Sequence, residues 1–276
     1  MTVVLALVAS VLWGAADFGG GVLSRRQPVF LVMLVSQALG LAALLLVAGL
    51  SGAYDDPGNY LPWGVAAGVA GWLGFLAFYR ALAIGPMGLV AAITGSAVLV
   101  PVGAGMVGGE RPSVVQVAGM VAAVVGVVLA SGPRSEGAAI HRRVVLLALV
   151  AALGFGTAVW CIGAGAEQNL SMVLVVQRCT NVLLGATLLV ALRPAVSFTP
   201  RELPALAFVG TAEVGANAAY GVAAGSGLVS VAAVLSSLYP VVTALLARWL
   251  LGERLTSVQR YGAAVAVSGV VLFAAH

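Results

Sequence analysis

The chain consists of long apolar segments separated by short polar breaks. A helix that crosses a bilayer needs about 20 mostly apolar residues, and ten segments approach that length. They cover residues 3–22, 29–50, 62–84, 87–107, 114–130, 144–164, 170–192, 204–224, 228–251 and 258–274. The breaks hold turn-forming residues such as Gly85-Pro86. The pattern predicts an all-α, polytopic membrane protein with ten transmembrane helices.

A sequence repeat divides the ten segments into two sets of five. The stretch GERPSVVQVAGMVAAVVGVVL at 109–129 matches GERLTSVQRYGAAVAVSGVVL at 252–272, with 12 identities in 21 positions. We expect a single membrane domain, 1–276, in which repeat 1 (1–131) and repeat 2 (144–276) are joined by a linker (132–143). Because five is odd, the two repeats should be inverted relative to one another, which is typical of secondary transporters.

The composition narrows the class of protein. Apolar residues make up 62% of the chain, charged residues 8%, and the mean hydropathy is +1.11, as expected of a bundle embedded in a lipid bilayer. A formal charge of +4 is too small for a nucleic-acid partner. No nucleotide-binding, metal-binding or nucleophile motif occurs in the sequence, so we expect no cofactor, no metal and no enzymatic activity.

The arginines predict the orientation in the membrane. One side of the predicted bundle holds Arg25, Arg26, Arg134, Arg142, Arg143, Arg193, Arg201, Arg248, Arg254 and Arg260, and the other side holds Arg111. Basic residues near helix ends stay in the cytoplasm. We therefore expect a bacterial cytoplasmic-membrane protein with both termini outside the cytoplasm.

Two five-helix halves, each closing with Gly-Glu-Arg, a glutamine and two spaced glycines (109–129 and 252–272), resemble the drug/metabolite transporter superfamily, specifically its ten-helix EamA-type members. The resemblance covers essentially the whole chain. It implies small-molecule transport, typically the export of amino acids, metabolites or drugs. It also implies an arginine in the second helix of each repeat. Arg178 fits this pattern in repeat 2, whereas repeat 1 has Gln37.

The eighth segment carries polar residues within the predicted membrane span. Glu213 lies at its middle, and Asn217 and Tyr220 follow on the same helix face. Lipid cannot satisfy these groups, so they should face the bundle interior or a wet cavity. Glu213 can bind a solute or exchange a proton there, or it can form a structural ion pair with Arg178. The two roles are compatible if solute binding competes with the pair.

The first segment carries a second carboxylate. Asp17 shares a helix face with Ser10 and Trp13. It can serve as a cavity carboxylate beside the flat wall of Trp13. Alternatively, it neutralises Arg80, which lies at similar depth in the third segment, or it reaches the membrane interface.

Aromatic and hydroxyl side chains complete the set of candidates. Tyr79 and Tyr220 occupy equivalent positions of the two repeats. They have either a structural role in helix packing or line the cavity. On the ninth segment, hydroxyls such as that of Ser237 can bind a solute or donate back to a helix carbonyl. The predicted site residues are Glu213, Asp17, Arg178, Asn217, Tyr220, Trp13, Tyr79, Ser237 and Tyr239.

Prolines and helix starts predict structural features. Pro101 and Pro240 should kink the fourth and ninth helices, but they lie about one turn apart in the repeat alignment, so we expect kinks that are not strictly symmetric. Ser113 and Thr256 are candidate caps for the helices that follow. Glu110 and Glu253 precede these helices, where a carboxylate is favoured by exposed amides.

The sequence thus predicts a secondary transporter that moves a small organic solute by alternating access. Export is the favoured direction, an amine-bearing or cationic solute suits the acidic centre, and protons are candidate coupling ions. We expect a monomer in a lipid bilayer. A passive facilitator, a membrane scaffold and a lipid-modifying membrane enzyme are the alternatives, although no convergent catalytic set supports the last.

Overall fold

The computed structural model describes residues 1–24, 27, 29–55, 58–84, 93–109, 111–130, 142–192, 200–226, 229–251 and 256–274. Every element of regular secondary structure within these ranges is helical, which confirms the all-α prediction. Glu110, Glu253 and most of the predicted linker fall outside the described residues, as does the start of the fourth predicted segment.

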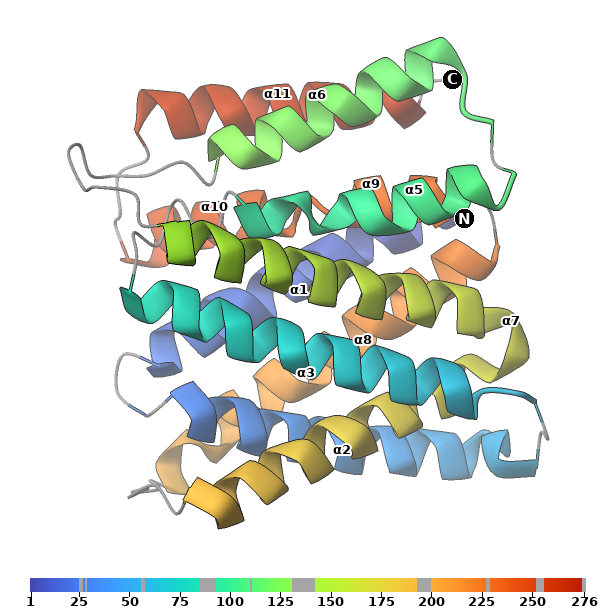
Figure 1. Cartoon of the computed structure of the whole chain (residues 1–276), viewed down its shortest axis with the longest axis vertical. Coiled ribbons are helices and arrows are strands. Elements are labelled where there is room, and N and C mark those ends of the chain that lie inside the picture. Colours follow the sequence, from blue (N-terminus) through green and yellow to red (C-terminus); the bar gives the residue numbers. More distant parts are fainter. Residues whose placement is uncertain are drawn as a thin grey trace.

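The helices lie side by side with roughly parallel axes, and α1 begins at the end of the bundle where α11 ends (Figure 1). An even number of crossings requires this arrangement. The helices are α1 (Thr2–Ser24), α2 (Val29–Leu50), α3 (Leu61–Ile84), α5 (Leu99–Val107), α6 (Val114–Ala130), α7 (Arg142–Leu192), α8 (Leu203–Gly225), α9 (Val229–Ser236), α10 (Tyr239–Leu251) and α11 (Ser257–Ala274). Three short 3-10 helices accompany them: η1 (Ala53–Asp55), η2 (Gly95–Val98) and η3 (Pro200–Glu202).

The long helix α7 is two helices joined at Asn169. The backbone leaves helical geometry there, with φ −168° and ψ 90°. The amide of Met172 donates to Asn169 Oδ1 at 3.0 Å, which caps the second half of α7. Asn169 Nδ2 donates to the carbonyl oxygen of Ala53 at 2.9 Å. The predicted break between the sixth and seventh segments is therefore confirmed.

Four of the described helices have the length and apolarity of membrane spans. Those long enough to cross a bilayer are Thr2–Leu23, Phe30–Leu50, Leu61–Phe78 and Arg142–Ala191, the last being twice the needed length. Shorter apolar helices cover Gly95–Val107, Val114–Leu129 and Val229–Thr243. Large apolar side chains such as Leu46 and Leu183 point outward, where hydrocarbon chains of the bilayer can cover them.

The last helices of the two repeats cross in an antiparallel, symmetric contact. A Cβ added to Gly126 of α6 would lie 2.7 Å from the carbonyl oxygen of Gly262, and one added to Gly269 of α11 would lie 2.7 Å from that of Gly119. Both pairs are related by the same offset of 143 residues. Equivalent helices thus run in opposite directions, as inverted repeats require, and these two lie together at one end of the molecule (Figure 1).

A second symmetric contact lies where the first helix of one repeat meets the fourth helix of the other. A Cβ added to Gly14 of α1 would lie 2.6 Å from Val242 Cβ, and one added to Gly156 of α7 would lie 2.7 Å from Val100 Cβ. Both pairs are again equivalent between the repeats, here at an offset of 142 residues. The inverted arrangement therefore also includes the first and fourth helices of both repeats.

The fourth and ninth membrane segments are both interrupted, but not asymmetrically as we expected from their prolines. The 3-10 turn η2 starts at Gly95, and the break between α9 and α10 starts at Ser237, which is the equivalent position. Pro101 and Pro240 are still one turn apart. The close crossings at Gly14 and Gly156 lie beside the two breaks, so equivalent packing between the repeats accompanies equivalent breaks.

The start of α6 explains one conserved feature of the internal repeat. The amide of Gln116 donates to Ser113 Oγ at 3.2 Å, and the amide of Ser113 donates to Gln116 Oε1 at 2.8 Å. This reciprocal capping box confirms Ser113 as the predicted cap. Thr256 and Gln259 stand at the same spacing at the start of α11.

Candidate functional site

A cluster of polar side chains lies inside the bundle where α2, α7 and α8 meet. Arg178 of α7 forms an ion pair with Glu213 of α8, with 3.1 Å between Nη1 and Oε2. Gln37 of α2 donates from Nε2 to the same carboxylate oxygen at 3.0 Å and accepts a hydrogen bond from Arg178 Nη1 through its own Oε1. The arginine side chain is 1% exposed and that of the glutamate 22%. The ion-pair interpretation of Glu213 is therefore the geometry that the structure adopts.

Close backbone contact between α2 and α8 brings Gln37 to Glu213. A Cβ added to Gly40 would lie 2.8 Å from the carbonyl oxygen of Gly210, so side chains larger than glycine would force the two helices apart. Gly40 lies about one turn from Gln37, and Gly210 about one turn from Glu213. The contact thus fixes the partners of the carboxylate before any solute arrives.

The cluster retains unused hydrogen-bonding atoms. Asn181, one turn beyond Arg178 on α7, donates to Gln37 Oε1 at 3.4 Å. Arg178 Nη2 and Asn181 Oδ1 are both buried and have no hydrogen-bond partner in the described structure. Buried polar atoms are normally satisfied by protein or water. One unused donor beside one unused acceptor suits an ordered water or a polar group of a solute.

A second group of side chains, from α1, α8 and α10, surrounds Trp13. The indole Nε1 donates to Asn217 Oδ1 at 3.0 Å. The ring of Trp13 lies 5.8 Å from that of Tyr220 and 6.2 Å from that of Tyr239, centroid to centroid. Asn217 also donates to Gln177 Oε1 at 3.5 Å. Four of the predicted site residues therefore meet in one place, one helical turn from Glu213.

Asp17 lies one turn beyond Trp13 on α1, and its side chain is exposed. It is near enough to Glu213 for the two negative charges to repel each other, and near enough to interact electrostatically with Tyr239. It lies on the face of α1 that carries Trp13, which contacts Asn217 of α8 and Tyr239 of α10. Among the described ion pairs it has none with Arg80, so the cavity interpretation of Asp17 is favoured over the pairing with that arginine.

The remaining candidates have local roles or are not described. Ser237 is buried and donates to the carbonyl oxygen of Val234 at 2.7 Å, the backbone interaction that we named as its alternative. The neighbouring Ser236 donates to the carbonyl oxygen of Ala6 on α1 at 3.2 Å. Tyr79 lies in α3, but its side chain is outside the described set.

Sequence reasoning underestimated the second helix of each repeat. Gln37 is a full member of the cluster, and Gln177 and Asn181 contact it or its neighbours. A signal was present, because Gln177, Arg178 and Asn181 form a polar stripe with helical spacing in an apolar segment. Only the fold shows that this stripe faces Gln37.

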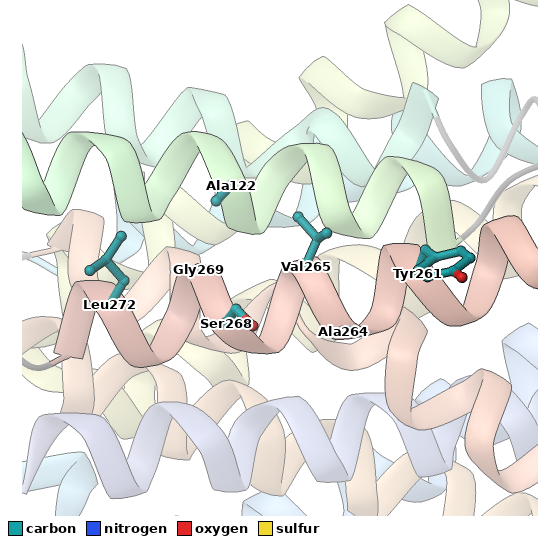
Figure 2. Close-up of a pocket in the computed structure, with 7 residues that line it drawn as sticks. All are labelled: Ala122, Tyr261, Ala264, Val265, Ser268, Gly269 and Leu272. Atoms are coloured by element: carbon teal, nitrogen blue, oxygen red, sulfur yellow. The ribbon is translucent and has the colours of Figure 1, made fainter.

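The groove between α6 and α11 is a different kind of feature. It has a volume of about 260 Å³ and is lined by Ala122, Tyr261, Ala264, Val265, Ser268, Gly269 and Leu272 (Figure 2). No carboxylate or guanidinium lines it. Since it is shallow, apolar and lined by other helices than the polar cluster, it suits hydrocarbon chains better than a polar solute.

Comparisons with known proteins agree with this architecture. The EamA-like transporter family matches twice, over residues 1–132 and 142–275. One solved crystal structure of a protein is similar with a TM-score of 0.81 and 21% identity, over 98% of this chain and 95% of the other; at that identity the likeness shows the fold alone. None of the curated proteins compared with the chain matches it. Since the two family matches cover nearly every residue, the chain is a polytopic membrane protein that belongs to the EamA-like transporter family of the drug/metabolite transporter superfamily.

Proposed function

We propose that this transporter exports a small, amine-bearing or cationic organic solute in exchange for protons. The observation that carries the proposal is the contact between Gln37 and Arg178. These residues occupy equivalent positions of the two repeats, at an offset of 141 residues, so their contact lies on the pseudo-two-fold axis. A polar site on that axis is equally related to both inverted halves, as alternating access requires.

The charges of the site support a cationic solute. Asp17 lies near Glu213, and among the described arginines Arg178 alone pairs with that glutamate. The aromatic rings beside them, Trp13 and Tyr239, can attract a positive charge through their faces. An anionic solute would meet repulsion from both carboxylates at this place.

Symmetric crossings and breaks support movement of the halves. We propose that repeat 1 (1–131) and repeat 2 (144–276) rock against each other around the axis, and that the interrupted helices α9–α10 and η2–α5 absorb the change. Helices that are interrupted near the membrane midplane are a recurrent feature of carriers. The arginine distribution supports a bacterial cytoplasmic membrane with both termini outside the cytoplasm.

The test is transport by purified protein in proteoliposomes under an imposed pH gradient. A panel of ethanolamine (monocation), putrescine (dication) and glycine (zwitterion) is added one at a time, and a trapped pH dye reports proton movement. We expect proton release coupled to a cationic solute and loss of this coupling in Glu213→Gln. Glu167→Gln is the matched control, because Glu167 is an exposed glutamate of α7, two residues before the break at Asn169.

A passive facilitator would give a different result. It would move solute at the same rate with and without the pH gradient and would release no protons. Unchanged proton-linked flux in Glu213→Gln would show that the central cluster does not take part in coupling.

A further inference from the structure

We propose that Asp17, and not Glu213, is the carboxylate that a proton and the cationic solute occupy in turn, so that each cycle exchanges one proton for one positive charge. This inference rests on the proposed function. It assigns Glu213 to the ion pair with Arg178 and Asp17 to the exchange of proton and solute. It reverses the order that the sequence suggests, where Glu213 at the middle of its helix is the stronger candidate.

The carboxylate of Glu213 is already bound by two neighbouring side chains. Its Oε2 accepts hydrogen bonds from both Arg178 Nη1 and Gln37 Nε2. The guanidinium is almost completely buried, so it needs a negative partner throughout the transport cycle. Removing the charge of Glu213, by a proton or by a bound cation, would leave that arginine uncompensated inside the membrane.

Asp17 is available. Its side chain is exposed, and no described hydrogen bond or ion pair restrains it. The helices packed against α1 bring few titratable groups to it. Glu213 faces it from α8 and Tyr239 from α10, while α2 and α9 contain no titratable residue; the side chain of Arg248 on α10 is outside the described set.

Among the described charged side chains of the site, those of Asp17, Glu213 and Arg178 leave one net negative charge. Arg178 cancels one carboxylate, and the second remains. A net charge held in a low-dielectric interior is unfavourable, so the site should change between its two open states only when one positive charge fills it. A proton fills it in one direction and a monocation in the other.

The exchange is balanced in protons and in charge. On the cytoplasmic side the cation displaces the proton of Asp17 into the solution. On the outer side a proton from the solution replaces the cation. One positive charge crosses in each direction, so a pH gradient drives the cycle and a membrane potential does not.

Infrared difference spectroscopy of the wild-type protein, recorded across a pH series, tests the assignment without any substitution. The chain has three aspartates, Asp17, Asp55 and Asp56, and Asp17 alone lies within a membrane helix. We expect a protonated-carboxyl band that shifts when the protein is labelled with ¹³C-aspartate. A shift with ¹³C-glutamate instead would overturn the proposal.

Two variants extend the test. We expect Asp17→Asn to lose the band, and to lose coupled exchange of whichever cation the wild type moves. In the swap Gln37→Glu with Glu213→Gln, a carboxylate stays beside Arg178, because residue 37 already contacts that guanidinium. We expect the swap to keep both the band and coupled exchange. Loss of the band in the swap together with its retention in Asp17→Asn would assign the proton to Glu213.

The spectroscopic result stands apart from transport. If no cation of the panel moves but the band follows ¹³C-aspartate, the proposed solute class fails and the assignment of Asp17 holds. If coupled transport occurs and the band follows ¹³C-glutamate, the proposed function holds and the assignment fails.

Discussion

The two repeats share their packing and differ in their charges. The glycine crossings of α6 with α11, and of α1 and α7 with the interrupted helices, recur at equivalent positions. At the centre, Gln37 stands where repeat 2 has Arg178, and the buried Trp72 stands where it has Glu213. The close helix crossings are the same in both copies. The charges of the site come from the residues that differ between the two repeats.

The largest expected effect comes from breaking the shared packing. A Cβ at Gly126 would meet the backbone of α11 around Ala266, so Gly126→Ala should destabilise the protein by about 3 kcal/mol or more. Gly103→Ala is the matched control, since a Cβ there meets nothing within 4 Å. Reversible unfolding in mixed micelles measures both. If the frame is symmetric, Gly269→Ala will match Gly126→Ala; a tolerated Gly126→Ala would contradict the crossing.

Removing one charge from repeat 2 comes next. Glu213→Leu leaves the buried guanidinium of Arg178 without a partner, and we expect a loss of about 3 kcal/mol in unfolding free energy. The double variant Arg178→Met with Glu213→Leu should recover most of that loss, because no uncompensated charge remains. A double-mutant cycle measures the coupling. Additive effects of the two substitutions would mean that the pair does not form.

Gln37 connects the two repeats at the site, and its loss should have a smaller effect. Gln37→Leu removes a donor to Glu213 and an acceptor of Arg178, for which we expect about 1–2 kcal/mol. Gln37→Glu introduces a second carboxylate beside the guanidinium. We expect that variant to bind the ethanolamine cation more tightly than the wild type, measured by calorimetry on purified protein; weaker binding would contradict a site selected by negative charge.

The smallest effect concerns a helix end. Ser113→Ala removes the reciprocal cap of α6, which should cost about 1 kcal/mol. The equivalent change in repeat 2, Thr256→Ala, should cost a similar amount if the capping box is part of the common frame. Thermal unfolding of the two variants side by side provides the comparison, and a large difference between them would limit the symmetry to the helix crossings.

The sequence contained most of the frame but only part of the site. The apolar pattern predicted the helices, and the 109–129 and 252–272 repeat predicted their inversion, because both signals are local. The ion pair between Arg178 and Glu213 was one of the two roles predicted for Glu213; the other was binding of a solute or a proton. The role of Gln37 required the contact of Gly40 with Gly210, which joins segments far apart in sequence.

The interrupted helices show the same limit. Proline positions suggested asymmetric kinks, whereas the breaks fall at equivalent places beside Gly14 and Gly156. A proline removes one hydrogen bond, but the neighbouring helix decides where the irregular turn fits. The sequence also could not show that Asp17 is not paired with Arg80. The two residues lie at similar depth in their segments, but depth alone does not say which helices are neighbours.

The most direct measurement is the electrical current across a supported membrane during exchange of the organic cation for protons. A site with one net negative charge predicts proton release equal to cation uptake, no steady current, and no response of the flux to membrane potential. A current that grows with cation uptake, or a flux that follows the potential at constant pH, would contradict it.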